Sequence, residues 1–144
     1  MFEAIKFEKV LQECEIQEGK IISIHSRGAE SKVLDIIEKY PNCGTPILHW
    51  FSGTVKELER ATKLDCWFSV NQQMARTKKG LSLIEKMPIN RLLPESDGPF
   101  TMSDKKLIYP WEAINIVGEI SSLWDLNEDV ILDQFRKNLR FLLN

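Results

Sequence analysis

Short apolar segments recur along the sequence at nearly equal intervals, and helix-like segments separate them. The four apolar segments end close to His25, His49, Asn71 and Asp97, which are 24, 22 and 26 residues apart. This spacing fits one strand followed by one helix. Strands that alternate with helices of about ten residues pair in parallel, because each helix returns the chain to the start of the next strand. The sequence therefore predicts an α/β fold of four parallel strands alternating with helices.

Apolar spacing and the positions of Gly, Pro and Asn predict where each element begins and ends. We expect strands at residues 21–25, 46–51, 66–70 and 91–96. We expect helices at residues 2–16, 29–40, 55–64, 78–86, 110–122 and 128–142, with Asn127 as the N-cap of the last. The apolar character of the strands agrees with parallel pairing, since parallel strands are usually covered on both faces.

The composition is that of one globular domain over residues 1–144, with 43% apolar and 28% charged residues. The formal net charge of −2 excludes a broadly basic surface for nucleic acid, so any phosphate site must be local. No apolar run is long enough for a membrane helix, and residues 1–8 lack the apolar segment of a signal peptide. We therefore expect a cytoplasmic protein without membrane contact and with three free thiols, at Cys14, Cys43 and Cys66.

The two histidines of the sequence, His25 and His49, lie at or beside the expected carboxyl ends of consecutive strands. Parallel α/β folds bind their ligands at this end of the sheet. A single histidine next to an apolar strand is usually a packed core or rim residue. Two histidines at equivalent strand ends favour shared ligation of one metal ion instead.

Asp97 closes the fourth expected strand, and strand alternation places Leu93, Glu95 and Asp97 on one face. Taken alone, Asp97 followed by Gly98 is typical of an ordinary turn. Together with two histidines, the carboxylate becomes a candidate metal ligand or catalytic base. Arg27, just before a helix, is a candidate for binding a phosphate, although a solvated charge explains it equally well.

Several aromatic residues lie near the expected strand ends: Trp50, Phe51, Trp67, Phe68 and Phe100. Aromatic rings stack on unpaired bases in proteins that bind single-stranded nucleic acid, but core packing is the more common role. The lysine pairs at residues 78–79 and 105–106 follow strands. They suit either a polyanion or a solvated surface.

Five sequence blocks resemble the second half of the TatD family of metal-dependent DNases, in the family's order and spacing. They are IHSRGAES around His25, HWFSGT from His49, CWFSVN from Cys66, ESDGPF from Glu95, and the late Asn138. The tryptophan-containing blocks HWFSG and CWFSVN further resemble the TatD-like nucleases of bacterial Qat anti-phage systems.

The resemblance implies the C-terminal half of a TIM-type (β/α)₈ barrel. It implies hydrolysis of phosphodiester bonds in DNA, single-stranded DNA in particular, with two divalent metal ions per complete barrel. The residues matching His25 and His49 bind one ion in this family, and the residue matching Asp97 serves the other ion and the attacking water. Mixed His and carboxylate ligands suit Mg²⁺, Mn²⁺ and Zn²⁺ alike, so the identity of the ion stays open.

A complete barrel takes about 250 residues, so this sequence supplies four of the eight strands. The HxHxD and GExGLD-like blocks of the family's first half do not occur in it, and Asp65 stands where the family usually has a left-handed Gly. We expect weak metal binding and no appreciable nuclease activity from this chain alone. Either an N-terminal half or a second copy is expected to cover the open barrel, and a truncated sequence is an equal alternative.

Two other functions stay open. The first is that of a non-catalytic interaction scaffold. The second is that of a different two-metal hydrolase, which cleaves amide or phosphomonoester bonds. Related barrels with such activities place similar ligands at the same rim.

Overall fold

The computed structural model describes residues 2–17, 19–103 and 106–144. The chain divides into two compact units, Met1–Trp67 and Phe68–Asn144. The assignment of residues 1–144 to a single domain stays a prediction. No helix in the described part of the chain is long and apolar enough to cross a bilayer.

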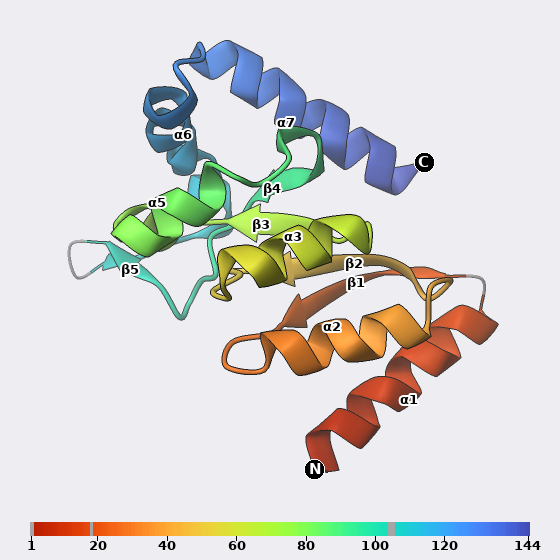
Figure 1. The fold of residues 1–144 in the computed structure, drawn as a ribbon. Helices are drawn as coiled ribbons and strands as arrows, with labels where there is room; N and C mark the ends of the chain where they lie inside the picture. The colour runs from red at the N-terminus through yellow and green to blue at the C-terminus, as the bar shows by residue number, and fades with distance from the viewer. Residues whose placement is uncertain (1, 18, 104–105) are drawn as a thin grey trace. The chain divides into compact units, whose positions relative to one another are not determined.

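The described residues of the first unit form the parallel strands β1 and β2 and the helices α1, α2 and α3 (Figure 1). Helix α1 (Phe2–Ile16) leads into strand β1 (Lys20–His25), and helix α2 (Glu30–Lys39) connects β1 to strand β2 (Gly44–His49). Helix α3 (Val55–Lys63) follows β2. Lys20 lies opposite Gly44 and His25 opposite His49, so the two strands end at the same level.

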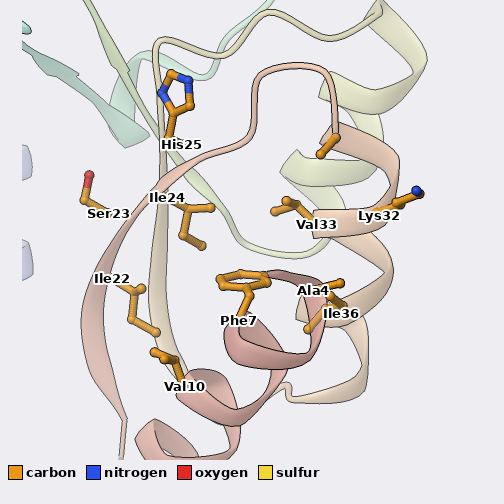
Figure 2. A pocket seen from close by; sticks show the side chains of 11 residues that line it. Ala4, Phe7, Val10, Ile22, Ser23, Ile24, His25, Lys32, Val33 and Ile36 are labelled. Atoms are coloured by element: carbon orange, nitrogen blue, oxygen red, sulfur yellow. The ribbon is translucent and has the colours of Figure 1, made fainter. Parts of the chain in front are cut away.

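Apolar residues from every layer of the first unit form its core. Its fully buried side chains include Leu11 of α1, Leu34 of α2, Leu48 of β2 and Leu58 of α3. Ile22 and Ile24 point from β1 toward Phe7 of α1, whereas Ser23 points to the other side of the strand (Figure 2). A mainly apolar cavity of about 460 Å³ remains between α1, β1 and α2.

The second unit is built on strand β4 (Leu92–Pro94), which is parallel to strand β3 (Trp67–Val70), with Phe68 opposite Leu92. Helices α4 (Gln72–Ala75) and α5 (Lys78–Ile84) and the 3₁₀ turn η1 (Ile89–Arg91) connect the two strands. After β4 come, in order, β5 (Met102–Ser103), β6 (Lys106–Leu107), η2 (Pro110–Ile116), α6 (Val117–Trp124) and α7 (Glu128–Leu143). Leu92, Ile116, Ile120 and Ile131 are among its fully buried side chains.

The predicted fold class, four parallel strands alternating with helices, is confirmed. Two details differ from the prediction. The fourth strand ends at Pro94 and not at residue 96, although the Glu95 amide still donates to the Val70 carbonyl at 2.9 Å. The helix expected at residues 110–122 begins as the 3₁₀ segment η2 and becomes α-helical only at Val117.

Candidate active site

His25 and His49 lie side by side at the carboxyl ends of β1 and β2. They are partners in the strand register, and His25 Nδ1 lies 2.8 Å from His49 Nε2. The ring centroids are 4.7 Å apart and the ring planes are inclined by 43°. A hydrogen bond at this distance needs one nitrogen to carry a proton and the other to offer a lone pair. The fold therefore directs two potential metal-binding nitrogens to one point.

The spacing of these nitrogens fits two ligands of one divalent ion. Two nitrogens bound to an ion at about 2.0–2.1 Å are separated by roughly 3 to 3.4 Å, so a small ring rotation is enough. Across residues 2–17, 19–103 and 106–144, no three His, Cys, Asp or Glu side chains are grouped as an ion site. A catalytic zinc usually takes three protein ligands. The histidine pair thus offers part of a ligand set.

The loop after His49 is fixed by its own sequence. Phe51 is 1% exposed, and a Cβ at Gly53 would lie 2.5 Å from the Phe51 ring, so this glycine leaves room for the phenyl group. Ser52 Oγ donates to Glu30 Oε1 at 2.9 Å, which ties the loop to the first turn of α2. Thr54 accepts from the Glu57 amide and begins α3 with a capping box. The HWFSGT block is therefore largely a structural support for His49.

Arg27 lies in the exposed turn between β1 and α2, two residues after His25. Gly28 has a φ of +74° in this turn, and the Ala29 amide donates to the Ser26 carbonyl at 2.8 Å. This conformation leaves the Arg27 side chain on the surface beside the start of α2. Its predicted contact with a phosphate stays a prediction.

Asp97 lies in the second unit, in a left-handed conformation with a φ of 50°. The extended strand has already ended at Pro94, so the alternation that grouped Asp97 with Leu93 and Glu95 does not reach it. Its carbonyl accepts from the Phe100 amide at 2.9 Å. Asp97 therefore occupies the turn that carries the chain away from β4, and its side chain is half-buried.

Glu95 is held by two side chains at the end of β3. Ser69 Oγ donates to one carboxylate oxygen at 2.5 Å, and Asn71 Nδ2 donates to the other at 3.0 Å. Asn71 Oδ1 in turn accepts from the Met74 amide and caps α4. The sequence did not predict that Ser69 and Asn71 bind Glu95. The only hint of such a network was the pair of acidic residues in the ESDGPF block.

The five aromatic residues near the strand ends differ in burial, and Trp50 is half-buried. Phe51, Trp67 and Phe68 are buried, at 1%, 5% and 0% exposure, and so belong to the core. Phe100 is 86% exposed. Of the lysine pair at residues 105–106, Lys105 lies outside the described residues.

The match to a known family covers almost the entire chain. The model of the TatD related DNases matches residues 5–144. The chain belongs to the TatD related DNase family. Its five blocks around His25, His49, Cys66, Glu95 and Asn138 thus occur in a member of the family they resemble.

Two curated TatD relatives match shorter stretches of the chain. "Deoxyribonuclease Tat-D" of Schizosaccharomyces pombe is 31% identical over 81 residues, which is 54% of this chain and 25% of the relative. The "3'-5' ssDNA/RNA exonuclease TatD" of Erwinia tasmaniensis is 28% identical over 85 residues, which is 56% of this chain and 33% of the relative. The chain matches only a minor part of these relatives' length.

Solved structures share the TatD fold. A TatD homologue from Escherichia coli K12 superimposes with a TM-score of 0.73 at 23% identity, covering 85% of this chain and 49% of that one. An uncharacterised amidohydrolase from Saccharomyces cerevisiae gives a TM-score of 0.83 at 15% identity, covering 96% and 59%. A TatD family hydrolase from Entamoeba histolytica gives 0.67 at 17% identity, covering 85% and 50%. The chain thus spans about half of each.

Proposed function

We propose that this chain forms the C-terminal portion of a TatD-type metal-dependent deoxyribonuclease that hydrolyses phosphodiester bonds in DNA. The observation that carries the proposal is the 2.8 Å approach of His25 Nδ1 and His49 Nε2 at two parallel strand ends, in a TatD family chain. The name of the Erwinia tasmaniensis relative further supports a single-stranded substrate. The tryptophan-containing blocks support a place among the TatD-like nucleases of Qat anti-phage systems.

The named residues have distinct roles in this proposal. His25 and His49 bind one of two divalent ions, with Mg²⁺, Mn²⁺ and Zn²⁺ as the candidates. When bound, such ions supply positive charge that neutralises the phosphate oxygens and makes a water acidic. Asp97 accepts the proton of the attacking water, whose oxygen bonds to phosphorus as the bond to the leaving oxygen breaks, and that proton then passes to the leaving oxygen to give an alcohol. Arg27 holds a non-bridging phosphate oxygen by charge-assisted hydrogen bonds.

The remaining ligands come from an N-terminal half in this proposal. The support is that the chain spans 49% to 59% of the three solved relatives. Two histidines alone leave the first ion short of a usual catalytic ligand set. We therefore propose that the chain alone is inactive and that a complementary half restores both the metal site and turnover.

The test compares cleavage of 5'-labelled single-stranded DNA by the chain alone and by the chain with the N-terminal half of a TatD homologue, in Mn²⁺ or Mg²⁺. We expect cleavage only in the complemented sample. Asp97→Asn is expected to lower its rate about 100-fold or more. Asp125→Asn is the matched control, because Asp125 is also left-handed, with a φ of 52°, and lies at the end of α6.

Each alternative outcome has a clear meaning. Full activity of a His25→Ala, His49→Ala double variant would contradict the metal assignment. Rapid cleavage by the chain alone would contradict the need for a second half. Cleavage of amide or phosphomonoester substrates in place of DNA would favour another hydrolase, and inactivity on all substrates would favour a scaffold.

A further inference from the structure

The second unit presents a group of exposed apolar side chains immediately after Asp97. We call it the aromatic strip, and it consists of Phe100, Met102, Leu107, Tyr109 and Trp111. Phe100 is 86% exposed and Trp111 73% exposed, and the other three are about half exposed. An isolated exposed apolar residue needs no explanation, but a contiguous group of this kind marks a binding surface.

The strip follows from the pairing of β5 with β6 (Figure 1). Met102 lies opposite Leu107, and the Ile108 amide donates to the Thr101 carbonyl at 3.3 Å. Thr101 and Ile108 are buried, at 2% and 7% exposure. Because side chains alternate along extended chains, the residues on either side of this buried pair point outward. Phe100 comes just before Thr101, in the turn in which its amide donates to the Asp97 carbonyl at 2.9 Å.

Two rings of the strip are already stacked. The ring centroids of Tyr109 and Trp111 are 4.7 Å apart and their planes differ by 3°, which is an offset parallel stack. Glu112 Oε2 accepts from the Tyr109 amide at 2.8 Å, and the Glu112 amide donates to the Tyr109 carbonyl at 2.9 Å. This turn fixes the backbone that carries both rings. The exposure of Trp111 leaves room for a further flat ring.

One cationic side chain, Arg76, is linked to the strip through Gln73, and two lysines follow Arg76 in the sequence. Gln73 Nε2 donates to the Met102 carbonyl, and Arg76 Nη1 donates to Gln73 Oε1 at 3.4 Å. Lys78 and Lys79 are exposed at the start of α5, two and three residues after Arg76. Arg76 thus brings positive charge toward Met102 of the strip, and the exposed Lys78 and Lys79 continue this charge along the chain, which suits a phosphate backbone.

We propose that the aromatic strip binds single-stranded DNA by stacking unpaired bases on Phe100, Tyr109 and Trp111. The phosphates then face Arg76, Lys78 and Lys79. Stacking is indifferent to base identity, because every base has a flat face, and duplex DNA hides these faces between its own base pairs. The choice of DNA as ligand rests on the proposed function, whereas the stacking itself needs no metal and no N-terminal half.

Binding of fluorescein-labelled dT₂₀ to the full chain, followed by fluorescence anisotropy in EDTA and low salt, tests this proposal. We expect Trp111→Ala to weaken binding about 5- to 150-fold, the range found for loss of one stacking ring. Trp111→Phe keeps a flat ring and is expected to retain most of the affinity. Phe141→Ala is the matched control, because Phe141 is an aromatic residue of α7 with 74% exposure.

Two further measurements sharpen the test. A duplex of equal length is expected to compete at least about tenfold less well than unlabelled dT₂₀. Lys78→Gln is expected to lower the slope of log affinity against log salt by about 0.7, the value for one phosphate contact on a single strand. The circular dichroism spectra and Tm of the variants verify that each is folded.

The proposal is overturned if the wild-type chain does not bind dT₂₀, if Trp111→Ala binds as well as Phe141→Ala, or if duplex competes equally. Failure of the proposed function is a separate result. If the complemented protein binds dT₂₀ through Trp111 but cleaves no DNA, the proposed role of the aromatic strip stands. The proposed nuclease function is then wrong. If the complemented protein cleaves DNA and Trp111→Ala changes neither KM nor binding, the nuclease proposal stands. The proposal that the aromatic strip binds DNA is then wrong.

Discussion

Left-handed aspartates close three segments of the chain. Asp65, Asp97 and Asp125 have φ values of 58°, 50° and 52°. The left-handed region costs little for Asp, whose short polar side chain bonds locally, and more for most other side chains. Asp65 and Asp125 lie just beyond the ends of α3 and α6, and Asp97 follows β4. The left-handed turn expected at Asp65 is confirmed.

Gly44 is expected to tolerate no side chain. It has a φ of +114°, and an added Cβ would lie 2.0 Å from the Lys20 carbonyl oxygen in the neighbouring strand. Gly44→Ala is therefore expected to lower the free energy of unfolding by about 3 kcal/mol or more, through strain and a backbone clash. Urea denaturation measures the loss.

Gly28→Ala is the matched control for this substitution. Gly28 is also left-handed, with a φ of +74°, but nothing lies within 4 Å of the added Cβ. Its expected cost is about 1 kcal/mol, from backbone strain alone. Equal losses at the two positions would contradict the clash at Gly44.

Cysteine reactivity is expected to follow burial. Burial raises the pKa of the Cys43 thiol above its usual 9.0, and Cys14 and Glu15 nearby raise it further. The thiolate is the reactive form, so Cys43 is expected to react with iodoacetamide about tenfold or more slowly than the half-buried Cys14 near pH 8. Peptide mapping by mass spectrometry measures both rates.

The contribution of the Cys43 thiol to the stability of the fold is expected to fall as the pH rises. A thiol whose pKa is higher in the folded state binds its proton more tightly there than in the unfolded chain. This contribution to stability is complete below pH 9.0 and is lost as the pH rises through the folded-state pKa. Equal labelling rates of Cys14 and Cys43 from pH 7 to pH 9 would contradict the raised pKa of the Cys43 thiol.

At the scale of elements, one amide side chain fastens the last helix to the end of the sheet. Asn138 of α7 is 3% exposed, and its Nδ2 donates to the carbonyls of Ile89 and Leu92 at 2.8 and 2.7 Å. Gln134 Nε2 donates to Asn138 Oδ1 at 2.7 Å. Asn138, noted from the sequence as a family position, thus links α7 to η1 and β4.

Asn138→Ala is expected to lower the free energy of unfolding by about 2 to 4 kcal/mol, because it leaves two carbonyls without their donor and opens a small space. Gln134→Ala, one turn earlier on the same helix, removes a single bond and is expected to cost about 1 kcal/mol or less. Guanidinium denaturation compares them. Similar losses for both variants would show that the carbonyl bonds of Asn138 contribute little.

The sequence predicted the long elements well and the short ones poorly. The helix expected at residues 29–40 forms as α2 and buries Val33, Leu34, Ile36 and Ile37, and Asn127 caps α7 as expected. Helix α4 and the pairing of β5 with β6 were not predicted, because elements of four and two residues carry no readable periodicity. The aromatic strip was missed for the same reason, except for Phe100.

For the candidate site, the sequence predicted that His25 and His49 lie close together. They end consecutive parallel strands, and such strands end at the same edge of a sheet. It did not predict the contacts that hold the site residues, such as Ser52 with Glu30 or Ser69 with Glu95. Those depend on side-chain directions in loops, which follow no repeat. The roles of Asp97 and Arg27 stay predictions.

At the scale of the whole molecule, apolar side chains are exposed at one edge strand of the sheet and line a cavity at the other. In the first unit, Ile21 of the edge strand β1 is 48% exposed. In the second, a cavity of about 280 Å³ lies beside β4 and is lined by Leu93, Pro94, Ile114, Leu132, Phe135, Arg136 and Leu139. Exposed strand edges and apolar grooves promote association.

An N-terminal half of a TatD homologue is therefore expected to raise the Tm of the chain by about 5 °C or more, because binding to the folded state stabilises it. Differential scanning fluorimetry measures the shift. Leu139→Glu is expected to reduce it, since Leu139 lines the groove beside β4. Lys137→Glu, on the same helix and outside that lining, is the control. A shift that is the same with an unrelated protein would contradict specific completion.

The equal register offsets have a consequence for how the chain acquires its fold. Lys20 pairs with Gly44 and Phe68 with Leu92, so in both cases the partners are 24 positions apart. Closing such a short loop costs little entropy, and low contact order speeds folding. Each strand pair can therefore assemble as soon as its second member leaves the ribosome, without waiting for distant sequence.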